Sequence, residues 1–347
     1  MSEDHVDVLV IGAGLSGIGA ASHLEREAPN KSYAILESRG AMGGTWDLFR
    51  YPGIRSDSDM HTLGYSFKPW KHERAIADGP AILDYIRETA REYDVEKHIR
   101  YNQRATKISW DSDRAVWTVT IEQEGANAST ISCNFIYSCT GYYRYDQGYT
   151  PDFPDIEQFK GQVIHPQLWP EDLDYADKNV VVIGSGATAI TVVPEMAKTA
   201  KHVTMLQRSP TYVVSRPGQD AFALRMNRWL PSKLAYLVTR WKNVSMQALL
   251  YQYSRRRPQK MKEFLLSLTR RELRGAVDVD THFNPKYNPW DQRLCLVPDS
   301  DLFRSLRKGT SSVVTDHIKR FTKTGIKLES GDLLKADIVV SATGLEL

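Results

Sequence analysis

Residues 6–17 read VDVLVIGAGLSG, and this stretch decides the fold. The apolar run 6–11 is typical of a buried parallel strand, and a helical pattern continues from the glycines to Leu24. A second short apolar run, 32–36, ends at Glu37. The order of strand, glycine-rich turn, helix and strand predicts a βαβ unit that binds a dinucleotide.

The residues of this unit have separate expected roles. Gly12 permits the tight turn, Gly14 lets the backbone approach the pyrophosphate, and Gly17 allows the helix to pack closely. The phosphates would lie at the amino end of the helix. Glu37 follows Gly17 by 20 residues, which is the spacing of a carboxylate that binds the ribose hydroxyls.

A second unit of the same kind begins at Asn179, with a strand at 180–183, a helix at 190–197 and a strand at 202–206. Its turn reads GSGATA, and we predict that Gly184, Gly186 and Thr188 hold a second dinucleotide.

The ribose position of this second unit carries no acid. Arg208 follows the second strand instead, and its guanidinium is suited to a 2′-phosphate that a carboxylate would repel. The sequence therefore favours NADPH over NADH. A surface arginine at the end of a strand is the alternative interpretation of Arg208.

Two nucleotide sites whose first glycines are 172 residues apart imply two cofactors in one chain. We predict the α/β class, with two Rossmann-like domains in which an FAD domain is interrupted by an NADPH domain. The apolar runs 135–138 and 338–341, each followed by a Thr-Gly pair, fit a chain that crosses between the two domains. The predicted parts are an FAD-binding domain at 1–145, an NADPH-binding domain at 146–216 and 276–341, a basic helical insert at 217–275, and a return to the FAD domain at 342–347.

The insert differs in charge from the rest of the chain. Between 221 and 275 there are 13 Lys and Arg residues against 2 Asp and Glu, a net charge of +11 in a chain of net +3. We predict two or three amphipathic helices, with breaks at Pro231 and Pro258. Residues 255–257 with Lys260 and Lys262 are suited to acidic lipids or a partner protein, and a solvated basic face is an equal alternative. No base-stacking or groove-reading motif accompanies them, so nucleic acid is not expected.

Composition and cysteine content exclude several other classes. The chain has 347 residues, enough for two or three domains with sizeable cores. Cys133, Cys139 and Cys295 are few and lack metal-site spacing, so we expect no structural zinc and a reducing, cytoplasmic environment. The acidic start MSEDH is unlike a signal peptide, and the uncharged run 8–24 holds four glycines, which favours strand, turn and helix over a membrane span.

Residues 43–57, GGTWDLFRYPGIRSD, lie where a disulfide oxidoreductase on this scaffold would carry its cysteine pair, and they contain no cysteine. Local thiol–disulfide chemistry is therefore excluded. The remaining possibility is an enzyme in which NADPH reduces the flavin and another oxidant reoxidises it. Dioxygen is the simplest such oxidant.

Two long patterns resemble those of one enzyme family. Residues 44–57 match GxWxxxx(F/Y)P(G/M)xxxD, and residues 159–170, FKGQVIHPQLWP, match FxGxxxHxxxWP. These are the motifs of the type I Baeyer–Villiger monooxygenases, a group of class B flavoprotein monooxygenases. The runs 43–70 and 280–298 look closest to the bacterial ethionamide-activating members. The resemblance covers nearly the whole chain.

The resemblance implies FAD, NADPH and O2 as reactants and a C(4a)-peroxyflavin that attacks ketones, to give esters or lactones, or oxidises sulfur compounds. It assigns Arg293 to holding the peroxyanion and Asp57 to positioning that arginine, with both beside the cofactors. An arginine suits this role because it stays charged and offers several donors. Without the resemblance, Asp57 could be a helix N-cap and Arg293 a structural ion-pair partner.

The resemblance also places Gly44, Thr45 and Trp46 at the flavin. The second motif would couple the two domains and give His165 a conformational role, although a hydrogen-bonded linker histidine is the simpler interpretation. For Trp46 and Trp169, an ordinary aromatic core position is the alternative. The residues of this second motif that carry the assignment are Phe159, Gly161, His165 and Trp169.

Two departures from the family pattern affect these expectations. Gln292 stands where many members have a lysine that binds the 2′-phosphate, which leaves more of that selectivity to Arg208. The chain ends at Leu347, whereas members continue through a segment that completes the FAD domain and lines the substrate pocket. Two alternatives therefore stay open: a flavin monooxygenase limited to N or S oxidation, and a non-catalytic chain that retains nucleotide binding.

Overall fold

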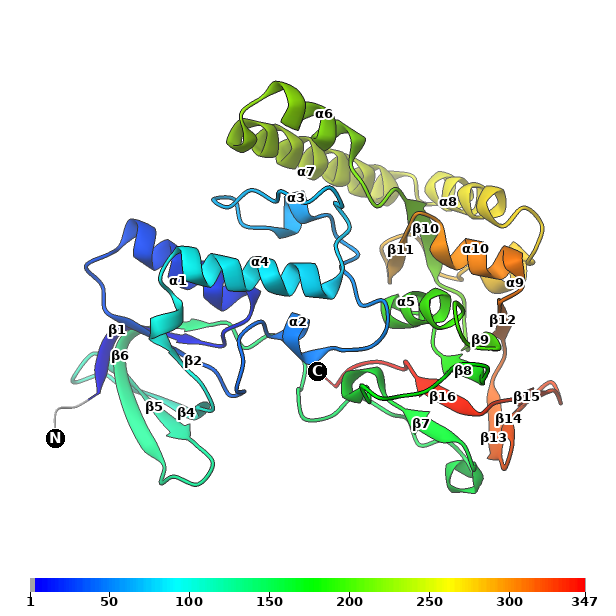
Figure 1. The fold of residues 1–347 in the computed structure, drawn as a ribbon, viewed down its shortest axis with the longest axis horizontal. Helices are drawn as coiled ribbons and strands as arrows, with labels where there is room; N and C mark the ends of the chain where they lie inside the picture. The colour runs from blue at the N-terminus through cyan, green and yellow to red at the C-terminus, as the bar shows by residue number, and fades with distance from the viewer. Residues whose placement is uncertain (1–3, 347) are drawn as a thin grey trace. The chain divides into compact units, whose positions relative to one another are not determined.

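The computed structural model describes residues 4–346, which form two units (Figure 1). Among these, the first unit comprises residues 4–48 and 79–143, and the second comprises residues 49–78 and 144–346.

The first unit is built on a six-stranded sheet in the order β3-β2-β1-β6-β5-β4. β1 pairs in parallel with β2 and β6, and β5 pairs antiparallel with β4 and β6. Leu9 and Val10 of β1 are fully buried, as the apolar run 6–11 predicts. The strands are β1 (His5–Ile11), β2 (Tyr33–Leu36), β3 (Ile99–Arg100), β4 (Arg104–Asp111), β5 (Val116–Glu122) and β6 (Ser129–Ser138).

Helices α1 (Leu15–Glu27) and α4 (Gly79–Glu92) pack against each other in this unit, and the short α2 (Thr45–Leu48) packs against α4. The 3₁₀ turn η1 (Glu96–His98) leads into β3. Strand, glycine turn, helix and strand follow one another as the sequence predicts, and Ile18 and Ala21 bury the inner face of α1. The first predicted βαβ unit is therefore confirmed.

The second unit contains a five-stranded sheet in the order β12-β9-β8-β16-β7, and all of its pairings are parallel. Helices α5 (Ala187–Met196) and α10 (Asp301–Lys308) pack together within its largest core. The second predicted βαβ unit is present as β8, α5 and β9. The strands are β7 (Gln162–Ile164), β8 (Asn179–Ile183), β9 (His202–Gln207), β12 (Ser311–Thr315) and β16 (Ile338–Ser341).

Smaller elements complete this unit. A parallel pair joins β10 (Tyr212–Arg216) to β11 (Leu294–Pro298). A three-stranded antiparallel sheet consists of β13 (Ile318–Thr322), β14 (Gly325–Leu328) and β15 (Leu333–Lys335). Short helical turns are α3 (Met60–Leu63), α9 (Val279–His282), η2 (Ile156–Gln158) and η3 (Pro166–Leu168).

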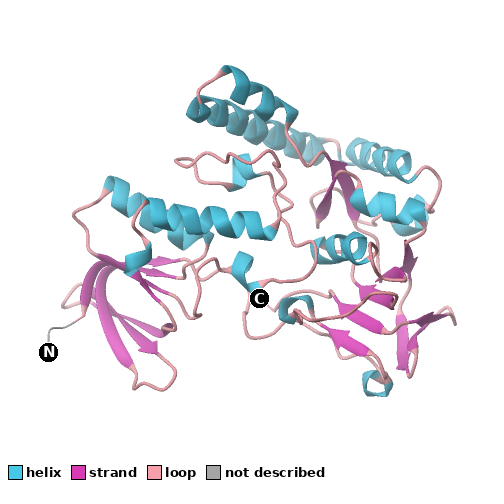
Figure 2. Cartoon of the chain, in the orientation of Figure 1, coloured by secondary structure: helices cyan, strands magenta, loops and turns pink. Residues whose placement is uncertain are grey.

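The predicted insert is all helical (Figure 2). It consists of α6 (Ala221–Trp229), α7 (Ser232–Arg256) and α8 (Pro258–Leu273). Pro231 and Pro258 lie at the two breaks between helices, as predicted, because proline is tolerated only in the first turn of a helix. Within residues 4–346, no helix is long and apolar enough to cross a bilayer.

The two compact units differ from the predicted domains in two segments. Residues 49–78, which we placed in the FAD domain, pack with the second unit through the Arg55–Asp301 ion pair and a polar network on α7. Residues 342–346 of the predicted return to the FAD domain also belong to the second unit, where the amide of Arg144 donates to the carbonyl of Glu346 over 2.7 Å, and residue 347 lies outside the described residues. Both differences arise from contacts between residues far apart in the sequence.

Candidate functional site

The first glycine turn shows which of its glycines the fold itself requires. Gly12 has a φ of +104°, and a Cβ on it would lie 2.5 Å from the carbonyl oxygen of Cys139. A Cβ on Gly17 would lie 1.9 Å from the carbonyl oxygen of Gly12. A Cβ on Gly14 would meet only Gly44 Cα, at 3.6 Å, which is an ordinary contact. Close packing of the backbone explains why positions 12 and 17 are glycine. It does not explain Gly14, where the protein itself has room for a Cβ.

The amino end of α1 is suited to an anion. Gly14 is its N-cap, and among the described residues no side chain caps this end and no acid lies in its first turn. Free amides and the helix dipole at such an end attract phosphate. Glu37 is buried, and its carboxylate accepts the amides of Ala13 and Arg39, each over 2.9 Å. Glu37 thus holds the turn as well as marking the predicted ribose position.

The start of the first motif, residues 44–48, lies beside this turn in the first unit. The amide of Gly43 donates to the carbonyl of Ala13 over 3.0 Å, which sets Gly44 against Gly14. Thr45 is hydrogen-bonded to the Tyr143 hydroxyl over 2.5 Å. Trp46 in α2 is half-buried. The structure therefore brings Gly44 next to the predicted pyrophosphate position, with Thr45 and Trp46 following in α2.

The second glycine turn repeats this arrangement in the second unit. Gly184 has a φ of +139°, and a Cβ on it would lie 2.3 Å from the carbonyl oxygen of Ala342. Gly186 is the N-cap of α5, and no side chain of the described chain caps that end. Gly186 has room for a Cβ, whose nearest contact is Arg293 Nη1 at 3.8 Å. The guanidinium of Arg293 therefore lies over the second turn.

Tyr51, in the part of the first motif that belongs to the second unit, lies beside this second turn, and no role was predicted for it. Its hydroxyl is hydrogen-bonded to Thr188 in the first turn of α5. Burial raises the pKa of Tyr51, while the Thr188 bond and the charge of Arg55 lower it. Its place at the (F/Y) position of the 44–57 pattern is the signal that could have identified it.

Arg293 and Asp57, the predicted catalytic pair, both affect the pKa of one buried thiol, that of Cys295. Burial raises the pKa of Cys295 to about 11, the charge of Arg293 lowers it, and the charge of Asp57 raises it. Both charged side chains are exposed, and no ion pair joins them or holds either one within residues 4–346. The charges of both residues therefore reach Cys295, and both exposed side chains are available to a ligand.

The alternatives for this pair find no support in the described residues. The N-cap of α3 is Asp59, whose carboxylate accepts the amide of Thr62 over 3.1 Å, so Asp57 does not cap a helix. The guanidinium of Arg293 makes no structural ion pair in the described part of the chain.

A polar network on α7 holds the segment that carries Asp57, and sequence reasoning missed it. Asp59 is buried and accepts bonds from Asn243 over 3.0 Å and from Gln247 over 3.1 Å. Arg240 donates to the carbonyls of His61 and Gly64, each over 2.8 Å. These partners are about 180 residues away in sequence, so no local pattern could have revealed them.

Arg208 stands at the predicted 2′-phosphate position. It is exposed directly after β9 and makes no hydrogen bond or ion pair within the described chain. Gln207 before it is buried and donates to Thr315 Oγ1 over 2.8 Å, which fixes the end of the strand. A free guanidinium on a fixed strand end is open to a ligand.

The second motif has mainly structural contacts. Phe159 packs on Phe321 with ring centroids 5.9 Å apart. A Cβ on Gly161 would lie 2.2 Å from the carbonyl oxygen of Asp337. Trp169 is partly buried against the largest core of the unit.

His165 makes a different kind of contact. Its Nε2 donates to the carbonyl of Gly344 over 3.1 Å, and the amide of Gln167 donates to its Nδ1 over 3.2 Å. The ring therefore joins two segments far apart in sequence and is held in the neutral form.

This contact predicts a pH dependence of stability. Burial lowers the pKa of His165 from its usual 6.5, although bonds to the carbonyls of Gly344 and Tyr149 raise it. The unfolded chain therefore binds this proton at a higher pH than the folded chain, and stability falls as the pH drops below 6.5. We expect His165→Gln to reduce this loss, measured as the urea midpoint at a series of pH values. The exposed His317→Gln is the control, and an unchanged slope in His165→Gln would contradict the assignment.

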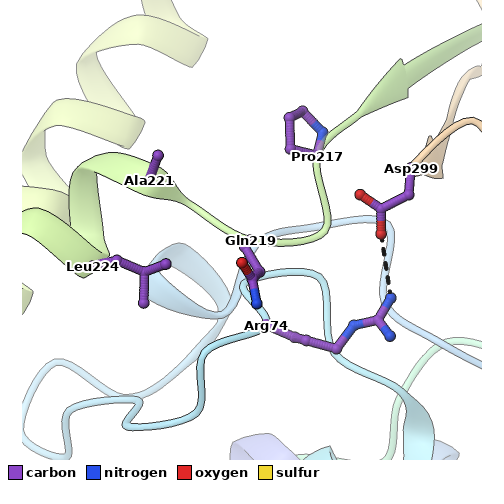
Figure 3. A pocket seen from close by; sticks show the side chains of 6 residues that line it. All are labelled: Arg74, Pro217, Gln219, Ala221, Leu224 and Asp299. Atoms are coloured by element: carbon purple, nitrogen blue, oxygen red, sulfur yellow. Dashed lines mark ion pairs between the residues drawn. The ribbon is translucent and has the colours of Figure 1, made fainter.

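One cavity of about 490 Å³ lies at the start of the insert (Figure 3). The Arg74–Asp299 ion pair, 3.6 Å long, forms one side of it, and Gln219 lies close to Arg74. None of its lining residues lies in either long motif; they are Arg74, Pro217, Gln219, Ala221, Leu224 and Asp299.

Comparisons with known proteins agree with one another. A family model described as flavin-binding monooxygenase-like matches residues 65–287, and one described as an NAD(P)-binding Rossmann-like domain matches residues 10–75. The FAD-containing monooxygenase EthA of Mycobacterium tuberculosis is 56% identical over 345 residues, which cover 99% of this chain and 70% of that protein.

Two solved structures share the fold. An oxidized steroid monooxygenase bound to NADP superposes with a TM-score of 0.79 at 24% identity, covering 99% of this chain and 72% of that one. A cyclohexanone monooxygenase bound to epsilon-caprolactone also gives 0.79, at 22% identity, covering 99% of this chain and 74% of the other.

Proposed function

Because this chain belongs to the flavin-binding monooxygenase-like family, we propose that it uses FAD, NADPH and O2 to oxygenate ketones or sulfur compounds. The family predicted from residues 44–57 and 159–170 is thereby confirmed. One observation carries the proposal: two uncapped glycine turns, one in each unit, the second with the Arg293 guanidinium over it. For a cyclic ketone the balance is ketone, O2, NADPH and a proton giving lactone, NADP⁺ and water.

The first turn fits FAD. Gly14 leaves room for a pyrophosphate, the uncapped amino end of α1 offers amides to it, and Glu37 offers carboxylate oxygens near the predicted ribose position. Gly44, Thr45 and Trp46 follow in the segment that lies against this turn. Bound FAD supplies two-electron redox chemistry and the means to activate O2.

The second turn fits NADPH. Gly184 makes the tight turn, Gly186 leaves space above the amino end of α5, and Thr188 lies in its first turn. Arg208 offers an unpaired guanidinium where a 2′-phosphate is expected, and guanidinium and phosphate geometries match. We assign the preference for NADPH over NADH to this residue.

We propose that Arg293 stabilises the negative charge that oxidation of a ketone requires, which favours ketones over amines as substrates. Attack on a carbonyl requires negative charge on the attacking oxygen, and a guanidinium stabilises that charge without giving up a proton at neutral pH. Asp57 is the nearby carboxylate that we propose orients it. The cyclohexanone monooxygenase among the structural neighbours, which is bound to a lactone, supports the same substrate class.

A visible absorption spectrum tests the proposal first. We expect the purified chain to show bound flavin that bleaches under anaerobic NADPH, and bleaches more slowly with NADH. Air and cyclohexanone should then give a lactone with one oxygen atom from labelled O2. Sulfoxide from a thioether without any lactone would favour the N- or S-oxidising alternative. A protein that stays colourless with added FAD would favour the non-catalytic one.

A further inference from the structure

One side of α7 is apolar and exposed. Its exposed residues recur at helical spacing, and each of them keeps more than a third of its surface open to solvent. The opposite side, with Ala235, Tyr236 and Asn243, is buried. We call the exposed set the outer face of α7; it consists of Leu234, Leu237, Val238, Trp241, Val244 and Leu249, with exposed fractions of 37% to 70%.

The helices of the insert also carry exposed cations without partners. Helices α6 and α7 contain no Asp or Glu. Several cations of the insert have partners within the protein, such as Lys242 with Asp220 and Arg255 with Asp291. Eight others are exposed, and their side chains have no hydrogen bond or ion pair in the described chain, namely Arg225, Arg228, Lys233, Arg256, Arg257, Lys260, Arg271 and Arg274.

We propose that α6 and α7 dock on an anionic lipid surface, with the outer face of α7 inserted among the headgroups. An apolar strip flanked by lysines and arginines is the composition of helices that lie in the plane of a membrane. Trp229 and Trp241, exposed by 79% and 62%, are of the side-chain type enriched at that depth.

Charge argues against a second copy of this chain as the occupant. Two outer faces placed together would bring the free cations of both copies close, and neither helix offers an acid to neutralise them. An anionic bilayer supplies many negative charges at once. It also dissolves the apolar ketones and thioethers of the proposed reaction, so docking would place the enzyme beside its substrates.

Vesicle co-sedimentation of the whole chain tests this proposal and needs no flavin or activity. We expect binding to vesicles that are roughly one third phosphatidylglycerol at low ionic strength, at least about tenfold stronger than to pure phosphatidylcholine, and loss of most of it at about 0.5 M salt.

Two variants separate the contributions. Leu237→Glu combined with Trp241→Glu should lower binding by at least about tenfold, and Arg256→Glu combined with Arg257→Glu should lower it and weaken its salt dependence. Leu333→Glu, an exposed leucine on β15, is the matched control and should bind as the native chain does. Equal binding by all variants would overturn the proposal.

Self-association is the competing outcome. In sedimentation velocity without lipid, we expect the native chain to form no concentration-dependent dimer. A dimer that is lost in the variant with Leu237→Glu and Trp241→Glu would indicate self-association through the outer face. Such a dimer, or binding that ignores the anionic lipid, would assign the outer face to another occupant.

Discussion

Replacing Arg293 by alanine should lower ketone oxygenation by about two to three orders of magnitude, the usual cost of removing one donor that stabilises transition-state charge. The guanidinium lies over the second glycine turn and makes no ion pair in the described residues, so its loss should leave the fold intact. NADPH consumption should continue and release hydrogen peroxide in place of lactone. Measuring NADPH, lactone and peroxide together gives the coupling ratio that checks this.

Three comparisons make the Arg293 experiment specific. Arg293→Lys keeps the charge but loses the planar fork, and we expect it to recover part of the lactone yield. Arg271→Ala, an exposed and unpaired arginine on α8, should behave as the native chain. Oxidation of a thioether should fall less than that of the ketone, because it does not require negative charge on the attacking oxygen. Native-like lactone yield in Arg293→Ala would remove the residue from the proposed machinery.

Local patterns predicted much of this fold. The β1-turn-α1 segment and the β8-turn-α5 segment each lie within about 25 residues, where strand period, glycine chemistry and helix period act on neighbouring positions. Pro231 and Pro258 likewise marked helix breaks because proline restricts its own backbone. Such features need no knowledge of the tertiary structure.

Long-range contacts explain what the sequence did not reveal. Residues 49–78 pack with the second unit because Tyr51 bonds Thr188 and Asp59 bonds Asn243, pairs separated by more than 130 positions. The N-cap interpretation of Asp57 was wrong, because Asp59, two residues later and of the same type, caps α3 in the structure. The family resemblance pointed to Arg293, but only the folded chain shows its guanidinium over Gly186.

The largest contrast should come from two alanine substitutions three residues apart. Gly17→Ala would place a Cβ 1.9 Å from the carbonyl oxygen of Gly12, and the clash can be relieved only by moving the backbone because the two nearest atoms belong to Gly12. We expect a loss of about 2–4 kcal/mol in the free energy of unfolding. Thermal unfolding of the FAD-free chain measures it.

Gly14→Ala should behave in the opposite way. Its backbone φ of −79° suits alanine, and the new Cβ would meet only Gly44 Cα at 3.6 Å, so the FAD-free chain should be as stable as the native one or up to about 1 kcal/mol more stable. Affinity for FAD, followed by flavin fluorescence, should nevertheless fall at least about tenfold, since the Cβ occupies the space that we assign to the pyrophosphate. Gly40→Ala, whose Cβ would meet only Asn102 Oδ1 at 3.5 Å, should change neither quantity. Equal destabilisation by Gly14→Ala and Gly17→Ala would mean that both glycines serve packing and that the first turn keeps no space for a cofactor.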